Sequence, residues 1–382
     1  MERVPLLLLF FGHVWVDASQ GILPVVLARL KEIFVLSYFQ VGVIMMLLNL
    51  TSSVIQPLFG YISDRAHLGW FVPVGILWTA LTMGLLGWSP NYLSACLLVG
   101  FAGLGTAAFH PRAMKAVYLV SGSRRGFGAA IFSTGGNLGF AVGPMVGGFL
   151  MLEFGLHATI GLLIPGMLLF ILILLQKEDL LKGKIPDGAF CQSDKKNEMS
   201  PFPWMPLTAV CLIVVLRSWV YTSFITYLPI FLQSRGINLK TGSLMLTVFL
   251  ACGAAAGLYG GHLSDRVGRR SVIVASMLLY PVLASLLILG SGPWLWVLSG
   301  ASGAALLASF SVTIVLAQEF LPSHLGLASG LILGLSFGTG GLGTALSGYL
   351  ADIVGLYKTT WILALVPILG ALLGGFIKGK EI

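Results

Sequence analysis

Twelve apolar runs, each long enough to cross a lipid bilayer, dominate this chain of 382 residues. A spanning helix needs about 20 mostly apolar residues, because each residue adds about 1.5 Å against roughly 30 Å of hydrocarbon. Only 9% of the residues are charged, which is too few to cover a water-soluble globule of this size. The sequence therefore predicts an all-α membrane protein. The expected spans are residues 5–28, 37–62, 71–88, 92–117, 126–151, 157–176, 205–232, 241–263, 271–290, 293–319, 324–350 and 355–377.

Basic residues fall mainly on one side of this topology. An even number of spans places both termini on the same side of the membrane. Of the 22 Lys and Arg residues, 16 lie in the termini and loops of that side, 5 lie on the other side, and Arg217 lies inside a span. The positive-inside rule therefore predicts cytoplasmic termini in a multi-pass protein of the plasma membrane, the inner membrane of a bacterium. Because the net charge of +8 is spread over separate loops, we expect no nucleic-acid partner.

The two halves of the chain repeat each other at an offset of about 201 residues. Residues 60–65, GYISDR, recur as residues 261–266, GHLSDR, and Pro165 in span six corresponds to Pro367 in span twelve. The repeat predicts two pseudo-symmetric six-helix bundles, 1–176 and 205–382, joined by a cytoplasmic linker over 177–204. The mixed charges and the Pro and Gly content of that segment are typical of a flexible tether. Parallel repeats of this kind place a transporter's substrate site between the halves, near the bilayer midplane.

Residues 261–270, GHLSDRVGRR, match the complete loop signature of the major facilitator superfamily, G-x-L-x-D-R-x-G-R-R. The first-half copy departs from it after its Asp-Arg pair. The chain is thus similar to a major facilitator transporter, which implies two six-helix bundles that work by alternating access. A carboxylate at this loop can cap a neighbouring helix N-terminus, and the arginines can pair across the same seam. Positive-inside anchoring is the alternative, but it does not account for the aspartate–glycine spacing. The predicted latch on the cytoplasmic side comprises Asp64, Arg65, Asp265, Arg266, Gly268, Arg269 and Arg270.

A glycine-rich segment in span five carries a second resemblance. It resembles the glycine-proline motif of proton-coupled drug antiporters, which symporters generally lack. Small residues let helices approach closely, and proline removes one helix hydrogen bond. We expect this face to pack tightly against the opposite half and to prevent leak. The residues of the motif are Gly139, Gly143, Pro144, Gly147 and Gly148.

Short segments in six spans resemble a narrower group, the fosmidomycin-resistance-like branch of these antiporters. This resemblance implies that the protein exports a small organic compound, similar to a phosphonate antibiotic, in exchange for protons. Span four departs from the general antiporter pattern because it lacks a mid-membrane arginine, and Arg112 stands where this branch should carry an acidic residue. The segments are Gly12-His13 with Asp17, Gln56-Pro57, Phe109-His110-Pro111, Gly135-Gly136-Asn137, Ala317-Gln318-Glu319, Ala328-Ser329-Gly330 and residues 338–343, GTGGLG.

Asp17 lies near the midplane of span one, where a carboxylate costs roughly 2.5–3.5 kcal/mol and normally faces a cavity or a partner. His13 precedes it by one helical turn on the same face. A His–Asp pair can accept and release a proton without leaving a bare charge. We predict that Asp17, His13 and His110 couple transport to protons. The alternatives are a static pair that fixes helix packing and, for His110, an interfacial histidine.

Arg217 lies at a similar depth in span seven. Its guanidinium could bind an anionic substrate, or it could pair with Asp17 across the bundle interface and hold one conformer closed. Acidic groups are scarce along the expected path, which favours an anionic or zwitterionic substrate. Glu319, at the end of span ten, can pair with a basic loop residue. The predicted substrate-binding residues are Arg217, His110, Asn137, Tyr221 and Gln318.

Other functions fit the sequence less well. A metabolite importer or facilitator of the same fold is the nearest alternative, and the span-five motif argues against it. A membrane-embedded enzyme or receptor is a more distant one, because His13 and Asp17 fit an H-x-x-x-D pattern without a partner cluster. The chain has no P-loop, which argues against ATP-driven transport. The four cysteines form no C-x-x-C pair, so we predict no metal site, disulfide or cofactor, and we expect a monomer.

Overall fold

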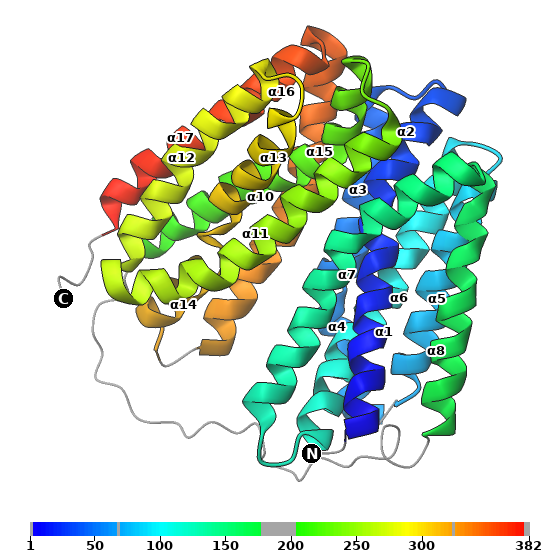
Figure 1. Ribbon diagram of the computed structural model, residues 1–382. Coiled ribbons are helices and arrows are strands. Elements are labelled where there is room, and N and C mark those ends of the chain that lie inside the picture. Colours follow the sequence, from blue (N-terminus) through cyan, green and yellow to red (C-terminus); the bar gives the residue numbers. More distant parts are fainter. Residues whose placement is uncertain (1–2, 67–68, 177–203, 323–324, 378–382) are drawn as a thin grey trace.

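The computed structural model describes residues 3–66, 69–176, 204–322 and 325–377 (Figure 1). All regular structure in these ranges is helical, and twelve helices are long and apolar enough to cross a membrane. This confirms the twelve predicted spans. The predicted linker lies outside the described residues except for its last residue, Trp204, which begins α10.

The first six spans are built from eleven helical segments in the described ranges, because three of them change helix type and one breaks at a turn. They are α1 (Arg3–Gly21) with α2 (Leu23–Ile33); α3 (Tyr38–Asn49), the π-helical η1 (Leu50–Val54) and α4 (Gln56–Ala66); α5 (Phe71–Leu85) with η2 (Leu86–Trp88); α6 (Tyr92–Val120); α7 (Arg125–Glu153); and η3 (Leu156–Leu162) with α8 (Leu163–Leu175).

The last six spans follow the same order. They are α10 (Trp204–Ser234); α11 (Leu239–Val267); α12 (Arg269–Leu289); α13 (Trp294–Leu307) with α14 (Phe310–Phe320); α15 (Leu325–Val354); and α16 (Leu356–Leu365) with α17 (Pro367–Leu373) and η4 (Gly374–Phe376).

Local sequence signals fix where several helices begin. The side chains of Ser37, Asn91 and Asn238 accept hydrogen bonds from backbone N–H groups in the first turns of α3, α6 and α11. Such caps satisfy N–H groups that have no partner within the helix. Gly268 separates α11 from α12 with a φ of +88°, a backbone conformation that suits glycine. The loop signature therefore carries a glycine at this position because the turn between α11 and α12 needs a positive φ.

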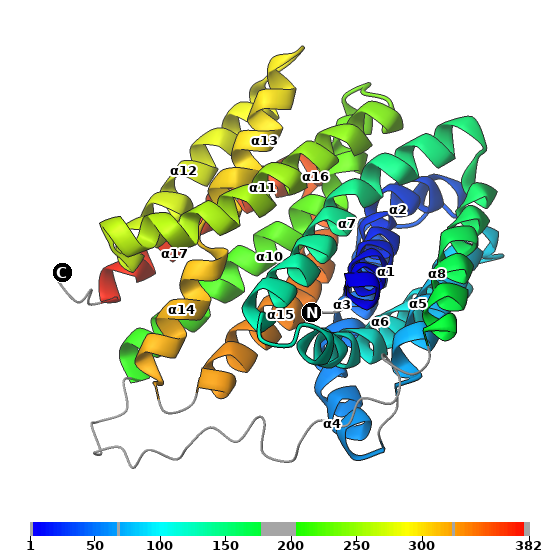
Figure 2. The ribbon, with the colours of Figure 1, turned by 60° about the horizontal axis from the view of Figure 1, so that its bottom comes forward.

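The helices form two bundles that diverge toward the end of the molecule where the N-terminus lies (Figures 1 and 2). The bundles contact each other mainly through α3 with α15 and through α7 with α11. At the start of α3, the Tyr227 hydroxyl donates a hydrogen bond of 2.9 Å to the Tyr38 carbonyl across the seam. At the far end of α7, Gly148 lies against Ser243 of α11. The structure is therefore closed at the end opposite the termini.

The span-five glycines face a different neighbour from the one we expected. A Cβ added at Gly139 would lie 2.1 Å from the Val14 carbonyl oxygen, and one at Gly143 would lie 2.6 Å from the Ala18 carbonyl oxygen. Gly147 likewise meets Ile22. Gly139 and Gly143 meet the backbone of span one and Gly147 meets its side chains, all within their own bundle. Among the four glycines of the motif, Gly148 packs against the opposite half, so the expectation of an inter-half face was wrong for the other three.

Candidate functional site

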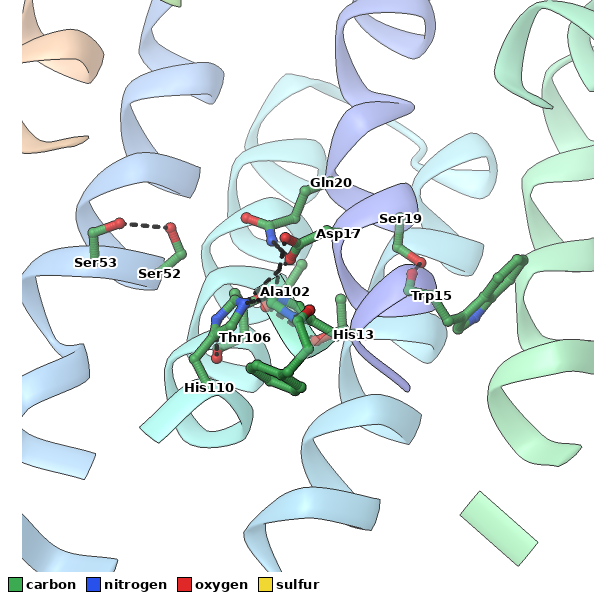
Figure 3. Close-up of polar contacts among 12 residues, drawn as sticks. His13, Trp15, Asp17, Ser19, Gln20, Ser52, Ser53, Ala102, Thr106 and His110 are labelled. Atoms are coloured by element: carbon green, nitrogen blue, oxygen red, sulfur yellow. Dashed lines mark hydrogen bonds and ion pairs between the residues drawn. The ribbon is translucent and has the colours of Figure 1, made fainter. Parts of the chain in front are cut away.

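Two histidines and one carboxylate meet in the middle of the first bundle (Figure 3). His13 and Asp17 come from α1, and His110 comes from α6. The two oxygens of Asp17 lie 3.3 Å from His13 Nε2 and 3.2 Å from His110 Nε2, and the two Nε2 atoms are 3.1 Å apart. Asp17 is the fifteenth residue of a span of 31, Arg3–Ile33, so this triad lies at mid-depth. The spacing of His13 and Asp17 along one helix predicted their contact. It did not predict that His110, on another helix, would also contact Asp17.

The hydrogen bonds of the other ring nitrogens define how the triad is protonated. His13 Nδ1 lies 2.7 Å from the Phe132 carbonyl oxygen, and His110 Nδ1 lies 3.1 Å from the Thr106 carbonyl oxygen. A carbonyl only accepts, so each Nδ1 must carry the hydrogen. In a neutral imidazole the Nε2 atom is then an acceptor. Two neutral rings would therefore turn their Nε2 lone pairs toward each other and toward the carboxylate, and a proton on either Nε2 would relieve that repulsion.

Neighbouring residues hold the triad in place. Gln20 Nε2 donates a hydrogen bond of 3.2 Å to Asp17 Oδ1. The Phe132 ring stacks on the His13 ring, with 4.0 Å between centroids. A Cβ at Gly136 would lie 2.5 Å from the His13 ring and 2.8 Å from Asp17 Oδ2, so glycine leaves the room that the triad fills. Sequence reasoning did not assign roles to Gln20 and Gly136.

The triad is partly accessible to solvent. The exposed fraction is 9% for the side chain of His13, 17% for Asp17 and 22% for His110. In the part of the chain that the structure describes, no lysine or arginine forms an ion pair with Asp17. The carboxylate therefore relies on the two histidines and Gln20, while protons or small ions can still reach it.

Arg217 is buried in the second bundle rather than paired with Asp17. Its side chain is 1% exposed, and Nη1 donates a hydrogen bond of 3.1 Å to Thr313 Oγ1. The guanidinium lies over the Phe310 ring, 5.1 Å from its centroid, and Nη2 has no hydrogen-bond partner among the described residues. The predicted alternative of an Asp17–Arg217 pair is not formed in this conformer. A buried guanidinium with spare donors is costly unless an anion completes its bonding.

The other predicted substrate residues lie apart from the triad. Asn137 is exposed on α7, and the Tyr221 ring stacks on Phe249 with 6.4 Å between centroids. Gln318 Nε2 donates a hydrogen bond of 2.7 Å to Ser329 within the second bundle. Across the described ranges, no hydrogen bond joins these three residues to the triad or to Arg217.

The loop-signature residues of the second half pair with each other. Arg269 contacts Asp265 and donates to Ser264 Oγ at 2.6 Å, and its ion pair with Glu319 measures 3.2 Å. The pairing expected for Glu319 is thus found. Arg266 and Arg270 are exposed. The side chains of Asp64 and Arg65 lie outside the described residues.

A carboxylate that we did not predict bridges the two bundles at the closed end. Asp352 lies near the end of α15, and its two oxygens accept hydrogen bonds of 2.8 and 2.9 Å from the backbone N–H groups of Tyr38 and Phe39. These groups open α3, where the helix dipole favours a negative charge. A single aspartate at a helix end gives no sequence signal of a partner more than 300 residues away.

Comparisons with known proteins agree with this architecture. The family model of the Major Facilitator Superfamily matches residues 9–243 and 210–380. The fosmidomycin resistance protein of Escherichia coli (strain K12) is 30% identical over 370 residues, covering 94% of this chain and 89% of that protein. The uncharacterized MFS-type transporter YfnC of Bacillus subtilis (strain 168) is 31% identical over 379 residues, covering 96% and 91%.

Solved structures share the fold at lower identity. A bacterial homolog of the human lysosomal transporter Spinster, in an inward-facing and occupied conformation, has a TM-score of 0.81 at 15% identity and covers 97% of this chain and 96% of its own. This similarity shows the fold alone. Together with the twelve spans and the family match, it places the chain among integral multi-pass membrane transporters. The chain belongs to the Major Facilitator Superfamily.

Proposed function

We propose that this protein is a secondary active transporter that exports a small organic anion or zwitterion in exchange for protons. The observation that carries the proposal is the convergence of two Nε2 lone pairs and the Asp17 carboxylate at mid-depth. A site of this kind binds one positive charge well and becomes electrostatically unfavourable when that charge leaves. The glycine-proline motif in span five and the similarity to a fosmidomycin resistance protein support export over import.

The bound proton would link the triad to the shape of the first bundle. When it is shared among His13, His110 and Asp17, it holds α1 against α6, and the Phe132 carbonyl extends the contact to α7. When it leaves, three acceptors face one another and the contact between α1 and α6 loosens. Because α7 also contacts α11 of the other bundle, loss of the proton changes the relative stability of the two conformers.

The conformer and the topology together suggest a direction. The basic residues favour cytoplasmic termini, and the bundles are closed at the opposite end. On this topology we propose that the conformer is the inward-facing state of a protein that acts as a monomer in the bacterial inner membrane. The proton would be released to the cytoplasm from this state, and the substrate would enter the site from the same side.

Arg217 supports the anionic nature of the substrate. It lies fourteenth in a span of 31 residues, Trp204–Ser234, and so at a depth close to that of Asp17 in the other bundle. Its free Nη2 can donate to a carboxylate or phosphonate, which would offset the cost of the buried charge. Side-chain motion of Arg217 away from Phe310 would bring it to the substrate.

The test is transport in membrane vesicles of inverted orientation, energised with a pH gradient. A panel of organic anions, including phosphonates, is compared with lipophilic cationic dyes. We expect anions or zwitterions to be taken up in a gradient-dependent way and to compete with one another. Gradient-driven uptake of the cationic dyes without competition from any anion would show that the protein is a general drug pump and that the substrate class is wrong.

A further inference from the structure

The triad brings together three side chains whose ligand atoms could bind one metal ion. Zinc binds histidine nitrogens and carboxylate oxygens at roughly 2.0–2.2 Å, which places neighbouring ligands of a tetrahedron about 3.3–3.6 Å apart. The two Nε2 atoms are 3.1 Å apart, and each contacts a different oxygen of Asp17: His110 lies 3.2 Å from Oδ1 and His13 lies 3.3 Å from Oδ2. With one ligand atom taken from each residue, the three atoms lie within 4.8 Å of one another, so side-chain adjustment would let the three groups bind one ion together.

The outer hydrogen bonds match those of histidines that bind metals. Such histidines almost always donate their second ring N–H to a carbonyl or carboxylate, which fixes the ring and leaves the other nitrogen free for the ion. Here both rings donate from Nδ1, to the carbonyls of Phe132 and Thr106. Gln20 donates to the carboxylate in the same way. Two independent carbonyl anchors, which turn both Nε2 atoms toward each other and toward the Asp17 carboxylate, go beyond what a simple His–Asp pair requires.

The surroundings also suit a cation. The groups packed around the triad are the rings of Phe109 and Phe132 and the glycine backbone at Gly136. Among the described residues, no basic side chain makes an ion pair or hydrogen bond with Asp17 other than the two histidines. His13 is buried, whereas Asp17 and His110 are partly exposed, and a fourth ligand such as water would have to approach from their side.

We propose that His13, Asp17 and His110 bind a divalent transition metal ion, with Zn²⁺ as the representative case. Two imidazoles and one carboxylate are ligands that Zn²⁺ prefers, whereas Mg²⁺ and Ca²⁺ prefer oxygen ligands. The ion and the proton are alternative occupants of the same acceptors, so Zn²⁺ would arrest the proton-coupled cycle; that consequence rests on the proposed function. The sequence predicted no metal site, because its cysteines form no metal-binding pair and the three ligands proposed here come from two separate spans.

The experiment is calorimetric titration of the purified full-length protein in detergent with Zn²⁺, and separately with Mg²⁺ and Ca²⁺. We expect one Zn²⁺ per chain and no saturable heat from the other two ions. Asp17→Asn and His110→Ala should each weaken Zn²⁺ binding by about tenfold or more, since each removes a ligand. His262→Ala is the matched control, because His262 is an exposed histidine on α11 of the other bundle, and it should bind as the wild type does.

X-ray absorption at the zinc edge should show two nitrogen ligands and at least one oxygen ligand, at roughly 2.0–2.2 Å. Asp17→Asn conserves the shape of the side chain, and size-exclusion chromatography of each variant shows whether it is folded. Lack of saturable Zn²⁺ binding, or binding unchanged in both triad variants, overturns the proposal. The titration uses neither substrate nor gradient, so failure to bind Zn²⁺ leaves proton-coupled export untouched, and failure to exchange protons leaves the metal site untouched.

Discussion

Asp352 should act as a lock on the closed end of the molecule. Its oxygens accept two backbone hydrogen bonds, of 2.8 and 2.9 Å, at the start of α3 in the other bundle. Asp352→Asn keeps the shape but removes the charge and one acceptor. Because the site is exposed, we take the interaction free energy that the substitution removes as about 1 kcal/mol, the upper part of the range for a charge at an exposed helix end. That corresponds to roughly a fivefold shift in population toward the conformer that is open at this end.

The assay is a distance measurement between spin labels at Pro90 and Ser291, which lie in loops of the two bundles at this end, in a protein without its native cysteines. We expect a larger fraction of long distances in Asp352→Asn and a smaller change in Asp352→Glu. Glu153→Gln is the matched control: Glu153 ends α7, and the facing helix α11 is capped by its own Asn238. Identical distance distributions in Asp352→Asn and the wild type would refute the lock.

Three further variants test other parts of the account. If the loop signature stabilises closure of the side where the termini lie, Asp265→Asn should make cysteines placed near residue 318 easier to label from that side. Unchanged labelling of these cysteines counts against the proposed latch. Gly143→Leu should lower the folding stability by about 1–3 kcal/mol, because the added side chain overpacks against the α1 backbone, and it should slow transport. Gly100→Leu is the control, because a Cβ there meets open space, and it should transport normally. Equal transport by the two variants contradicts the packing role. Arg217→Lys should weaken anion binding in competition assays and Arg217→Gln should weaken it more, and unaltered binding in both removes Arg217 from the site.

The spans could be predicted closely from sequence because the thickness of the bilayer sets their length. The third was expected at 71–88 and is Phe71–Trp88, and the sixth was expected at 157–176 and is Leu156–Leu175. The helix ends also carry local signals, such as the caps of α6 and α11. Length, hydropathy and caps are properties of neighbouring residues, so a single sequence contains them.

Contacts between distant helices could not be predicted in this way. Spacing placed His13 and Asp17 on one face, but the approach of His110 depends on how α6 crosses α1. The glycine motif of span five indicated a smooth face without indicating which helix it meets, and three of its four glycines meet span one instead of the other half. Asp352 shares no pattern with the start of α3 that it caps.

Proton exchange at the triad is the central claim, and Asp17→Asn in proteoliposomes tests it most directly. The asparagine mimics the neutral carboxyl group permanently. With a transported compound from the vesicle panel, an imposed pH gradient should drive uptake by the wild type and none by Asp17→Asn, while counterflow of the same compound persists in both. Uptake driven by the pH gradient at the wild-type rate in Asp17→Asn would contradict the account, because the cycle would then run without a proton on this carboxylate.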